Sequence, residues 1–372
     1  MEIQKIRKDF PIVQREIFLN HAATSPLPRP VAEAMKEYID KRMRGEAEPI
    51  DLEEGRLLFA SLIGAGSREI AIIPNTSTGL NMVANMLKYH AEANIVTTDL
   101  EFPTVTYPWL RKGLKVDVRY VESLDGWIPI EGFEEAIDDD TVVVAISHVE
   151  YTSGFRNDLE AIAEIAHEHG ALIMVDAIQS VGALRVDVKR SDIDFLAAST
   201  YKWILGPTGI GFMYIREELI NRFEPPFVGY AGVKPEVFET IDLWNNRELI
   251  LRDDAGRFEV SDPGMVNYVG AVAALKLLLK VGIDRIERRI LRLTGTLIDE
   301  LEDLGFWLQT PRDDKSRSGI VNFRTEDPGG VVSMLRSKGI RVSARAFGVR
   351  VSPHFYNTED EIYTLIQALK DL

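Results

Sequence analysis

Seven short apolar runs recur within the first 215 residues, and polar or helical stretches separate them. Each run is rich in Val and Ile and ends in polar or small residues. The runs are residues 69–74, 93–99, 115–121, 141–149, 171–177, 194–200 and 210–215. Near-continuous apolarity, rather than strict alternation, is typical of strands buried on both faces of a mainly parallel sheet. We therefore predict a large α/β domain with helices on both faces of the sheet, including one over residues 157–170.

The pattern changes after about residue 265. A long helix is predicted over residues 284–305, because its apolar residues fall on one stripe: Ile286, Ile290, Leu293, Leu297, Leu301 and Leu304. Strand patterns follow at 319–325 and 339–345, and a last helix opens where Thr358 and Glu361 have the spacing of a capping box. We expect residues 15–264 to form the large domain, and residues 1–14 with 265–372 a smaller α+β domain.

Length, charge and composition exclude several classes of protein. A chain of 372 residues suits one large and one smaller domain. The net charge of −15 argues against a nucleic-acid binder with a basic face. No apolar run approaches the roughly 20 residues of a membrane span, and the N-terminus lacks a secretory core. Without cysteine there is no disulfide, thiolate metal site or cysteine nucleophile. We expect a soluble, cytoplasmic protein that needs no metal.

One lysine, Lys202, lies between two apolar runs in "AASTYKWILGPTGIGFMYI", residues 197–215. Lysine is almost never fully buried unless a partner or a modification neutralises it. A solvated loop lysine between two buried strands is the simpler interpretation. Ser199 and Tyr201 flank this lysine.

Two other predicted strand ends carry polar chemistry, and ligands gather at the carboxyl ends of parallel strands. Asp176 ends one run and Gln179 follows it, while residues 75–78, "NTST", precede a helical pattern. Such a turn offers free backbone N–H groups and hydroxyls to a phosphate. Asp176 can also be a helix cap, and "NTST" an ordinary N-cap cluster. Together with Lys202, however, these features are what pyridoxal phosphate requires: an aldehyde-binding lysine, a carboxylate and a phosphate site.

The sequence resembles the class V aminotransferase group of pyridoxal-phosphate enzymes, which includes cysteine desulfurases, isopenicillin-N-epimerase-like proteins and kynureninase. The resemblance covers nearly the whole chain. It implies aminotransferase fold type I, pyridoxal 5'-phosphate as cofactor, an amino acid as substrate, and a homodimer with active sites at the interface. The matching segments are "FLNHAATSPLP" (18–28), "NTSTGLNMVAN" (75–85), "EFPTVTYPW" (101–109), "VDAIQSVG" (175–182), "STYKWILGPTGIG" (199–211) and "VRVSPHFYNTEDEI" (349–362).

The resemblance also implies a role for individual residues. Lys202 corresponds to the Schiff-base lysine and general base, and Asp176 to the acid at the pyridinium nitrogen. Phe102 corresponds to the ring that stacks on the cofactor, and Gln179 to a residue near its phenolic oxygen. The residues implied at the phosphate are Thr76, Ser77, Ser199 and Tyr201. Those implied at the substrate are Arg350, which holds the carboxylate, and Ala23 and Thr24 of the N-terminal loop.

Several positions depart from the family pattern. The absence of cysteine, and Phe102 in place of a proton-moving histidine, both argue against a persulfide mechanism. Glu150 and Tyr151 replace an asparagine that usually contacts the ring oxygen. Asp262 stands where a threonine commonly reaches the neighbouring subunit's phosphate, so either Ser261 substitutes for it or that contact has changed.

A long, weakly periodic segment, residues 227–264, is expected to reach the partner's cofactor pocket. Its aromatic residues are Phe227, Tyr230, Phe238, Trp244 and Phe258. We expect Asp262 to turn away from the partner's phosphate or to be neutralised by a cation such as Arg257.

Three classes of function remain after this comparison. An aminotransferase is the leading interpretation, and a cysteine-independent lyase or epimerase of the same fold is the alternative. A non-catalytic relative is the third. The first two need the same residues around the cofactor, so the sequence does not separate them. Of the histidines, we expect His148 to be a packed core residue, and His167 and His169 to belong to a solvated helix end rather than a metal site.

Overall fold

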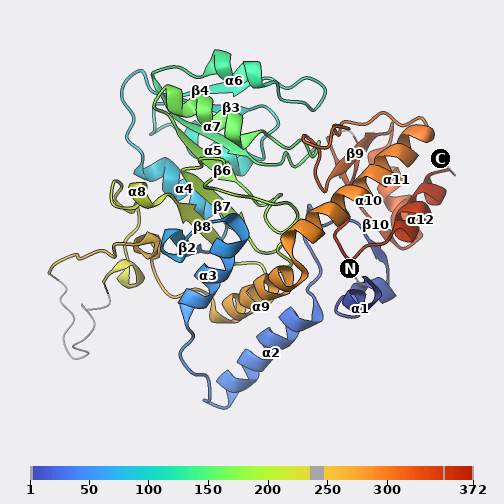
Figure 1. Ribbon diagram of the computed structural model, residues 1–372, viewed down its shortest axis with the longest axis horizontal. Helices are drawn as coiled ribbons and strands as arrows, with labels where there is room; N and C mark the ends of the chain where they lie inside the picture. Colours follow the sequence, from blue (N-terminus) through green and yellow to red (C-terminus); the bar gives the residue numbers. More distant parts are fainter. Residues whose placement is uncertain (1–2, 235–246, 347, 371–372) are drawn as a thin grey trace.

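The computed structural model describes residues 3–234, 247–346 and 348–370. Its centre is a seven-stranded sheet with the order β2-β8-β7-β6-β5-β3-β4 (Figure 1). The strands are β2 (Ile70–Ile73), β3 (Asn94–Thr98), β4 (Asp117–Val121), β5 (Thr141–Ser147), β6 (Leu172–Asp176), β7 (Phe195–Ser199) and β8 (Gly211–Ile215). β8 is antiparallel to both of its neighbours, whereas the other pairings are parallel. All seven predicted strands are confirmed.

Helices cover both faces of this sheet, and two apolar layers separate them from it. In β6, Ile173 and Val175 face one layer and Met174 faces the other, so both faces of the strand are buried. This double burial explains the continuous apolar runs in the sequence. The helices here are α3 (Leu52–Ile63), α4 (Thr76–Met86), α5 (Pro103–Leu110), α6 (Ile130–Ala136), α7 (Leu159–Glu168) and α8 (Glu217–Ile220). The predicted α/β class with a mainly parallel sheet is confirmed.

The C-terminal part begins with two helices that meet at Gly282, whose φ of 90° lies in the left-handed region. The elements are α9 (Met265–Val281), α10 (Ile283–Asp303), β9 (Val321–Arg324), α11 (Pro328–Ser337), β10 (Ile340–Arg341), β11 (Ser343–Arg345), β12 (Gly348–Val351) and α12 (Glu359–Leu369). The long helix and its buried stripe are confirmed, and the Thr358–Glu361 capping box is present.

The prediction of one strand at 339–345 is wrong. Val342 divides it into β10 and β11, which belong to different sheets. β10 pairs in parallel with β1 (Ile17–Phe18), whereas β11 pairs with β12, and β12 pairs with β9, both antiparallel. The alternation of side chains cannot reveal such a division, because both short strands keep the same periodicity.

The N-terminal segment packs against the C-terminal elements. It contains α1 (Ile3–Arg7) and the 3-10 turn η1 (Pro11–Gln14), and α2 (Arg29–Met43) follows (Figure 1). Phe10 stacks on Tyr356 with ring centroids 3.9 Å apart, and Arg7 forms an ion pair with Glu361 at 2.7 Å. The loop after β1 is thereby placed beside the end of β12. The proposed domain boundaries remain a prediction.

Within the described ranges, no single helix is long and apolar enough to cross a membrane. Taken together, α9 and α10 would pass by length and composition, but they are bent by 80° at their junction.

Candidate active site

Neighbouring parallel strands end together at one edge of the sheet, and the candidate site is built there. Asp176 is the last residue of β6, where it lies between Ser147 of β5 and Ala197 of β7 in the strand register. Lys202 follows the end of β7 in a tight loop. That loop is closed by backbone hydrogen bonds from Leu205 N to Lys202 O (3.0 Å) and from Gly206 N to Thr200 O (2.8 Å).

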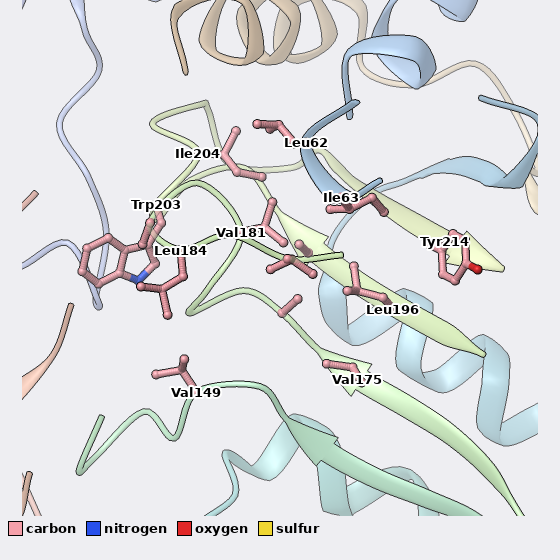
Figure 2. Packing of buried hydrophobic residues seen from close by; sticks show 14 of the residues in the cluster. Leu62, Ile63, Val149, Val175, Val181, Leu184, Leu196, Trp203, Ile204 and Tyr214 are labelled. Atoms are coloured by element: carbon pink, nitrogen blue, oxygen red, sulfur yellow. The ribbon is translucent and has the colours of Figure 1, made fainter. Parts of the chain in front are cut away.

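The residues that follow Lys202 anchor its loop in the hydrophobic core. Trp203 and Ile204 are fully buried, and Figure 2 shows their side chains among those of Val181 and Leu184. Leu205 adopts a left-handed backbone with φ of 63°. For a residue with a side chain this costs about 1–3 kcal/mol, and such strain is found mainly at functional sites. Packing therefore fixes where the lysine can point.

Lys202 and Asp176 influence each other across this edge. Burial lowers the pKa of Lys202 to about 8, and the Asp176 charge partly opposes that shift. Burial also raises the pKa of Asp176 to about 6, although the N–H of Ile178 (2.9 Å) and the Lys202 charge favour its ionised form. At neutral pH the site therefore holds a carboxylate beside an amine that loses its proton far more readily than an exposed lysine.

Two aromatic rings flank the lysine amine. Its Nζ lies 5.9 Å from the ring centroid of Phe102 and 5.9 Å from that of Tyr201. Phe102 is 46% exposed although it immediately precedes α5. An exposed aromatic face beside a reactive amine is suited to cover a flat, conjugated ring.

The predicted phosphate turn forms at the N-terminus of α4. Asn75 caps the helix by accepting a hydrogen bond from Thr78 N (2.9 Å). Thr76 N donates to Ser199 Oγ (2.8 Å), and Ser199 N donates to Thr76 Oγ1 (2.9 Å), so the turn is joined to the end of β7. The Thr104 hydroxyl donates to Ser77 Oγ. Hydroxyls at a helix N-terminus are suited to bind an anion, and Thr104, which the sequence did not single out, contacts one of these hydroxyls.

Gln179 connects the lysine loop to the N-terminal loop. Its Nε2 donates to Ala22 O (3.0 Å), and its Oε1 accepts from Trp203 Nε1 (2.9 Å). An amide nitrogen can donate twice, so a further contact to a cofactor oxygen is compatible with this arrangement. Ala23 and Thr24 form a turn on Asn20, and Ser25 N donates to Tyr201 O (2.9 Å). The predicted substrate loop thus lies against the lysine loop.

Arg350 reaches the site from β12. It is 1% exposed, and its Nη1 donates to the backbone oxygen of Tyr151 (2.6 Å). Its buried Nε has no hydrogen-bond partner within the described ranges. Burial, and then Arg345, lower the pKa of Arg350 to about 9, so it remains a cation at neutral pH. The Tyr151 ring lies edge-on to the Phe102 ring, with the ring centroids 5.2 Å apart. Tyr151 and Phe102 therefore lie between Arg350 and Lys202 in one series of neighbours.

Two buried glutamates lie behind Asp176. Glu101 accepts hydrogen bonds from Ser147 N (2.5 Å) and Oγ (2.6 Å). Glu150 accepts from Asn157 Nδ2 (3.0 Å), while its Oε2 has no partner among the residues described. Burial and the nearby Glu150 raise the pKa of Glu101 well above its ordinary value, and burial raises that of Glu150 to about 8. Burial therefore favours the protonated form of Glu150, which departs from the family pattern, and Glu101 is a buried carboxyl that the sequence did not single out.

Asp262 lies in the segment 227–264, which we expect to reach the partner's cofactor pocket. Asp262 is exposed, and its N–H donates to the Tyr230 hydroxyl (3.1 Å). Arg257 Nη1 donates to Asn221 Oδ1, and in the part of the chain that the structure describes it forms no ion pair with Asp262. Phe238 and Trp244, two aromatics of the segment 227–264, lie outside the described residues.

The histidines do not form a metal centre. His148 is buried, and burial lowers its pKa to about 3, as expected of a core residue. His354 is also buried, with Nε2 3.0 Å from Trp203 O, so it supports the lysine loop from behind. The two ring nitrogens of His167 lie within 3.0 Å of carboxylate oxygens of Asp192 and Asp194. We expected a solvated side chain at this helix end, and His167 instead has two partners. No metal-binding group occurs among the described residues.

Comparison with known proteins identifies the family of this chain. The family model "Aminotransferase class-V" matches residues 17–365. The chain belongs to the class V aminotransferase family. It is 32% identical to the "Uncharacterized aminotransferase YcbU" of Bacillus subtilis, over 96% of this chain and 95% of that protein. It is 33% identical to a "Probable cysteine desulfurase" of Pyrococcus abyssi, over 99% and 97%. The apo structure of a cysteine desulfurase from Thermococcus onnurineus superposes with a TM-score of 0.87 at 30% identity, covering 99% and 97%.

Family membership confirms the resemblance, the type I aminotransferase fold, and a pyridoxal-phosphate-dependent enzyme acting on amino acids. The residues present fit this cofactor. Asp176 is a buried carboxylate that can accept a pyridinium N–H, the hydroxyls at the start of α4 suit a phosphate, and Phe102 presents an exposed ring face. The cofactor therefore fits the edge of the sheet at which Lys202 lies.

We predict that Glu150 makes the protein less stable as the pH rises. A carboxyl whose pKa is raised on folding makes the native state bind more protons than the unfolded state between pH 4.5 and 8, so the free energy of unfolding falls across that range. Glu150→Gln should remove up to about 4 kcal/mol of that fall, measured by urea unfolding of the cofactor-free protein at pH 5 and pH 8.5. Glu134→Gln, an exposed control on α6, should behave like wild type. Identical pH dependence in Glu150→Gln and wild type would contradict the buried protonated carboxyl.

Proposed function

We propose that this chain is an aminotransferase in which Lys202 binds pyridoxal phosphate and moves the substrate proton. The observation that carries the proposal is the position of the Lys202 amine, desolvated at the carboxyl edge of the sheet, next to Asp176 and between two aromatic rings. When bound there, pyridoxal phosphate supplies an electron sink for negative charge that develops at the substrate Cα.

Lys202 and Asp176 take complementary roles in this proposal. With its pKa near 8, the Lys202 amine is partly deprotonated at neutral pH and can accept the Cα proton as a general base. Asp176, with its pKa near 6, stays mostly ionised and holds a proton on the ring nitrogen opposite. Phe102 covers one face of the ring and keeps water from it. Thr76, Ser77 and Ser199, assisted by Tyr201, hold the phosphate.

Arg350 binds the substrate carboxylate in this arrangement. Its guanidinium is held by Tyr151 O, and a planar fork of donors fits a carboxylate in a bidentate geometry that lysine cannot reproduce. The Ala23–Thr24 turn is joined to the lysine loop by the hydrogen bond from Ser25 N to Tyr201 O (2.9 Å), and in this proposal it borders the substrate. Gln179 keeps this turn and the lysine loop together.

Transfer of an amino group fits the composition better than sulfur transfer to the enzyme. Several relatives are named cysteine desulfurases, yet this chain has no cysteine to carry a persulfide. Phe102 cannot exchange protons either. A cysteine-independent lyase would use the same residues around the cofactor, and the products formed distinguish it from a transferase.

We also propose a homodimer whose active sites lie at the interface. In support, four large apolar residues of the segment 227–264 are each more than two-fifths exposed: Phe227, Val228, Leu249 and Ile250. Exposed apolar patches of this kind mark protein contacts. The cytoplasmic location expected from the sequence stays a prediction.

Sedimentation velocity at micromolar concentration tests the dimer. The expected species has twice the 41.9 kDa mass of the chain. A stable monomer with full activity would contradict a shared active site.

The assignment of Lys202 has a direct test. Borohydride reduction of the holo-protein, followed by peptide mapping, should place the cofactor on Lys202. Lys202→Ala should keep the fold, as judged by circular dichroism, and lose at least about 1000-fold in turnover because the proton-moving amine is gone. Lys202→Arg is the matched control, since it keeps a cation but cannot bind the aldehyde, and it should be equally inactive. Cofactor on another lysine would exclude the assignment.

The reaction class has a separate test on the same holo-protein. A panel of amino acids is added and the absorption spectrum is followed. An aminotransferase converts the cofactor to its amine form and releases a 2-oxo acid without free ammonia. Release of ammonia together with pyruvate would identify a lyase instead.

A further inference from the structure

A second arginine lies on the same face of the small sheet as Arg350. In the β11–β12 hairpin, Ser343 is opposite Arg350 and Arg345 is opposite Gly348. Residues opposite each other in antiparallel strands share a face, as do residues two apart along one strand. Arg345 and Arg350 are therefore diagonal neighbours on one face, and such neighbours lie about 7–8 Å apart.

Asn322 of β9 fixes this arrangement. It lies opposite Arg350 in the register, and its Nδ2 donates both to Arg345 O (3.1 Å) and to Thr152 O (3.1 Å). Asn322 is fully buried, so the backbone of Arg345 is tied to the wall of the site although its side chain is exposed. Asn322 therefore fixes the Arg345 backbone relative to Arg350.

Neither arginine has an acidic partner in the residues that the structure describes. Arg350 donates to Tyr151 O, and Arg345 Nη1 donates to Ala344 O. Two arginines on the neighbouring strands already have a partner: Arg341 of β10 pairs with Glu16 at 2.9 Å, and Arg324 of β9 stacks over the Trp307 ring at 4.3 Å. Arg345 and Arg350 are the two whose charge is left for a ligand.

Positive charge exceeds negative charge around the proposed substrate site. The charges of Arg350 and Arg345 both lower the pKa of Lys202, so the two guanidinium groups lie close enough to the lysine to act on it electrostatically. Burial raises the pKa of the nearby carboxyls Glu101 and Glu150, which favours their neutral forms and reduces the negative charge on this side of the site. One substrate carboxylate on Arg350 still leaves Arg345 unneutralised.

We propose that Arg345 is a specificity-determining residue that binds a second carboxylate, so that the preferred substrates are amino acids with an acidic side chain. The inference rests on the proposed function, in which Arg350 holds the α-carboxylate, and it names the substrate class of that site. Two arginine side chains from diagonal positions can close on the two ends of a four- or five-carbon dicarboxylate, each through a charge-assisted pair of hydrogen bonds.

Binding without turnover tests the second carboxylate first. Succinate and butyrate have the same four-carbon chain and differ in one carboxylate, and both are titrated into the holo-protein by calorimetry. Succinate should bind about 10- to 100-fold more tightly than butyrate, and Arg345→Gln should abolish that preference. The control Arg324→Gln alters an arginine on the same face that already stacks on Trp307, and it should keep the preference. Equal binding of succinate and butyrate to wild type, or an unchanged preference in Arg345→Gln, would overturn the proposal.

Amino acids then test the substrate class. The spectral change of the holo-protein is titrated with glutamate against glutamine and with aspartate against asparagine. Arg345→Gln should weaken the acidic pair about 10- to 100-fold and leave the neutral pair unchanged. Equal weakening of acidic and neutral amino acids would place Arg345 at the α-carboxylate and refute the inference. If no amino acid changes the wild-type spectrum, the proposed function fails, while the succinate preference still decides the role of Arg345.

Discussion

The charges of Lys202, which is partly buried, and Asp176, which is fully buried, act on each other at the carboxyl edge of the sheet, and the rest of the site depends on this interaction. Lowering a lysine pKa to about 8 corresponds to roughly 3 kcal/mol of unfavourable burial of its charge. The loop stays in place because Trp203 and Ile204, the next two residues, are fully buried. Each such side chain contributes about 1.5–3 kcal/mol, which offsets both the buried charge and the strained backbone of Leu205.

Phe102 and Tyr151 connect this edge of the sheet to the substrate end. The Phe102 ring centroid lies 5.9 Å from the lysine amine and 5.2 Å from the Tyr151 ring centroid, and the Tyr151 backbone oxygen accepts a hydrogen bond from Arg350. In the proposed function, these contacts set the position of a carboxylate on Arg350 relative to the Lys202 amine. The replacement of the family's usual asparagine by Glu150 and Tyr151 is compatible with this role, because Glu150 is kept neutral by burial and adds no charge beside the ring.

The sequence predicted the sheet and the central residues of the site for physical reasons. Strands buried on both faces leave continuous apolar runs, and an isolated lysine or aspartate at the end of such a run stands out. Thr76 and Ser199 were predicted separately, through the family resemblance, and the structure joins them by hydrogen bonds. Their roles toward the cofactor and substrate stay predictions.

Other features could not be predicted from the sequence. The division of residues 339–345 at Val342 depends on which strands are available as partners, and local periodicity cannot report that. Glu101 and Thr104 lie in the matched segment 101–109, but their contacts to Ser147 of β5 and Ser77 of α4 appear only in the folded chain. Nothing in the sequence distinguishes Arg345 from the other arginines. Only the register of β11 with β12 places it diagonal to Arg350.

The central claim is that burial, tempered by Asp176, sets the basicity of Lys202. It is tested most directly by the pH dependence of reductive methylation of Lys202 in the cofactor-free protein, followed by mass spectrometry of its peptide. The account predicts a midpoint near pH 8, and a still lower midpoint in Asp176→Asn because the charge that raises the pKa is removed. A midpoint near 10.5, the ordinary value for lysine, with no response to Asp176→Asn would contradict it.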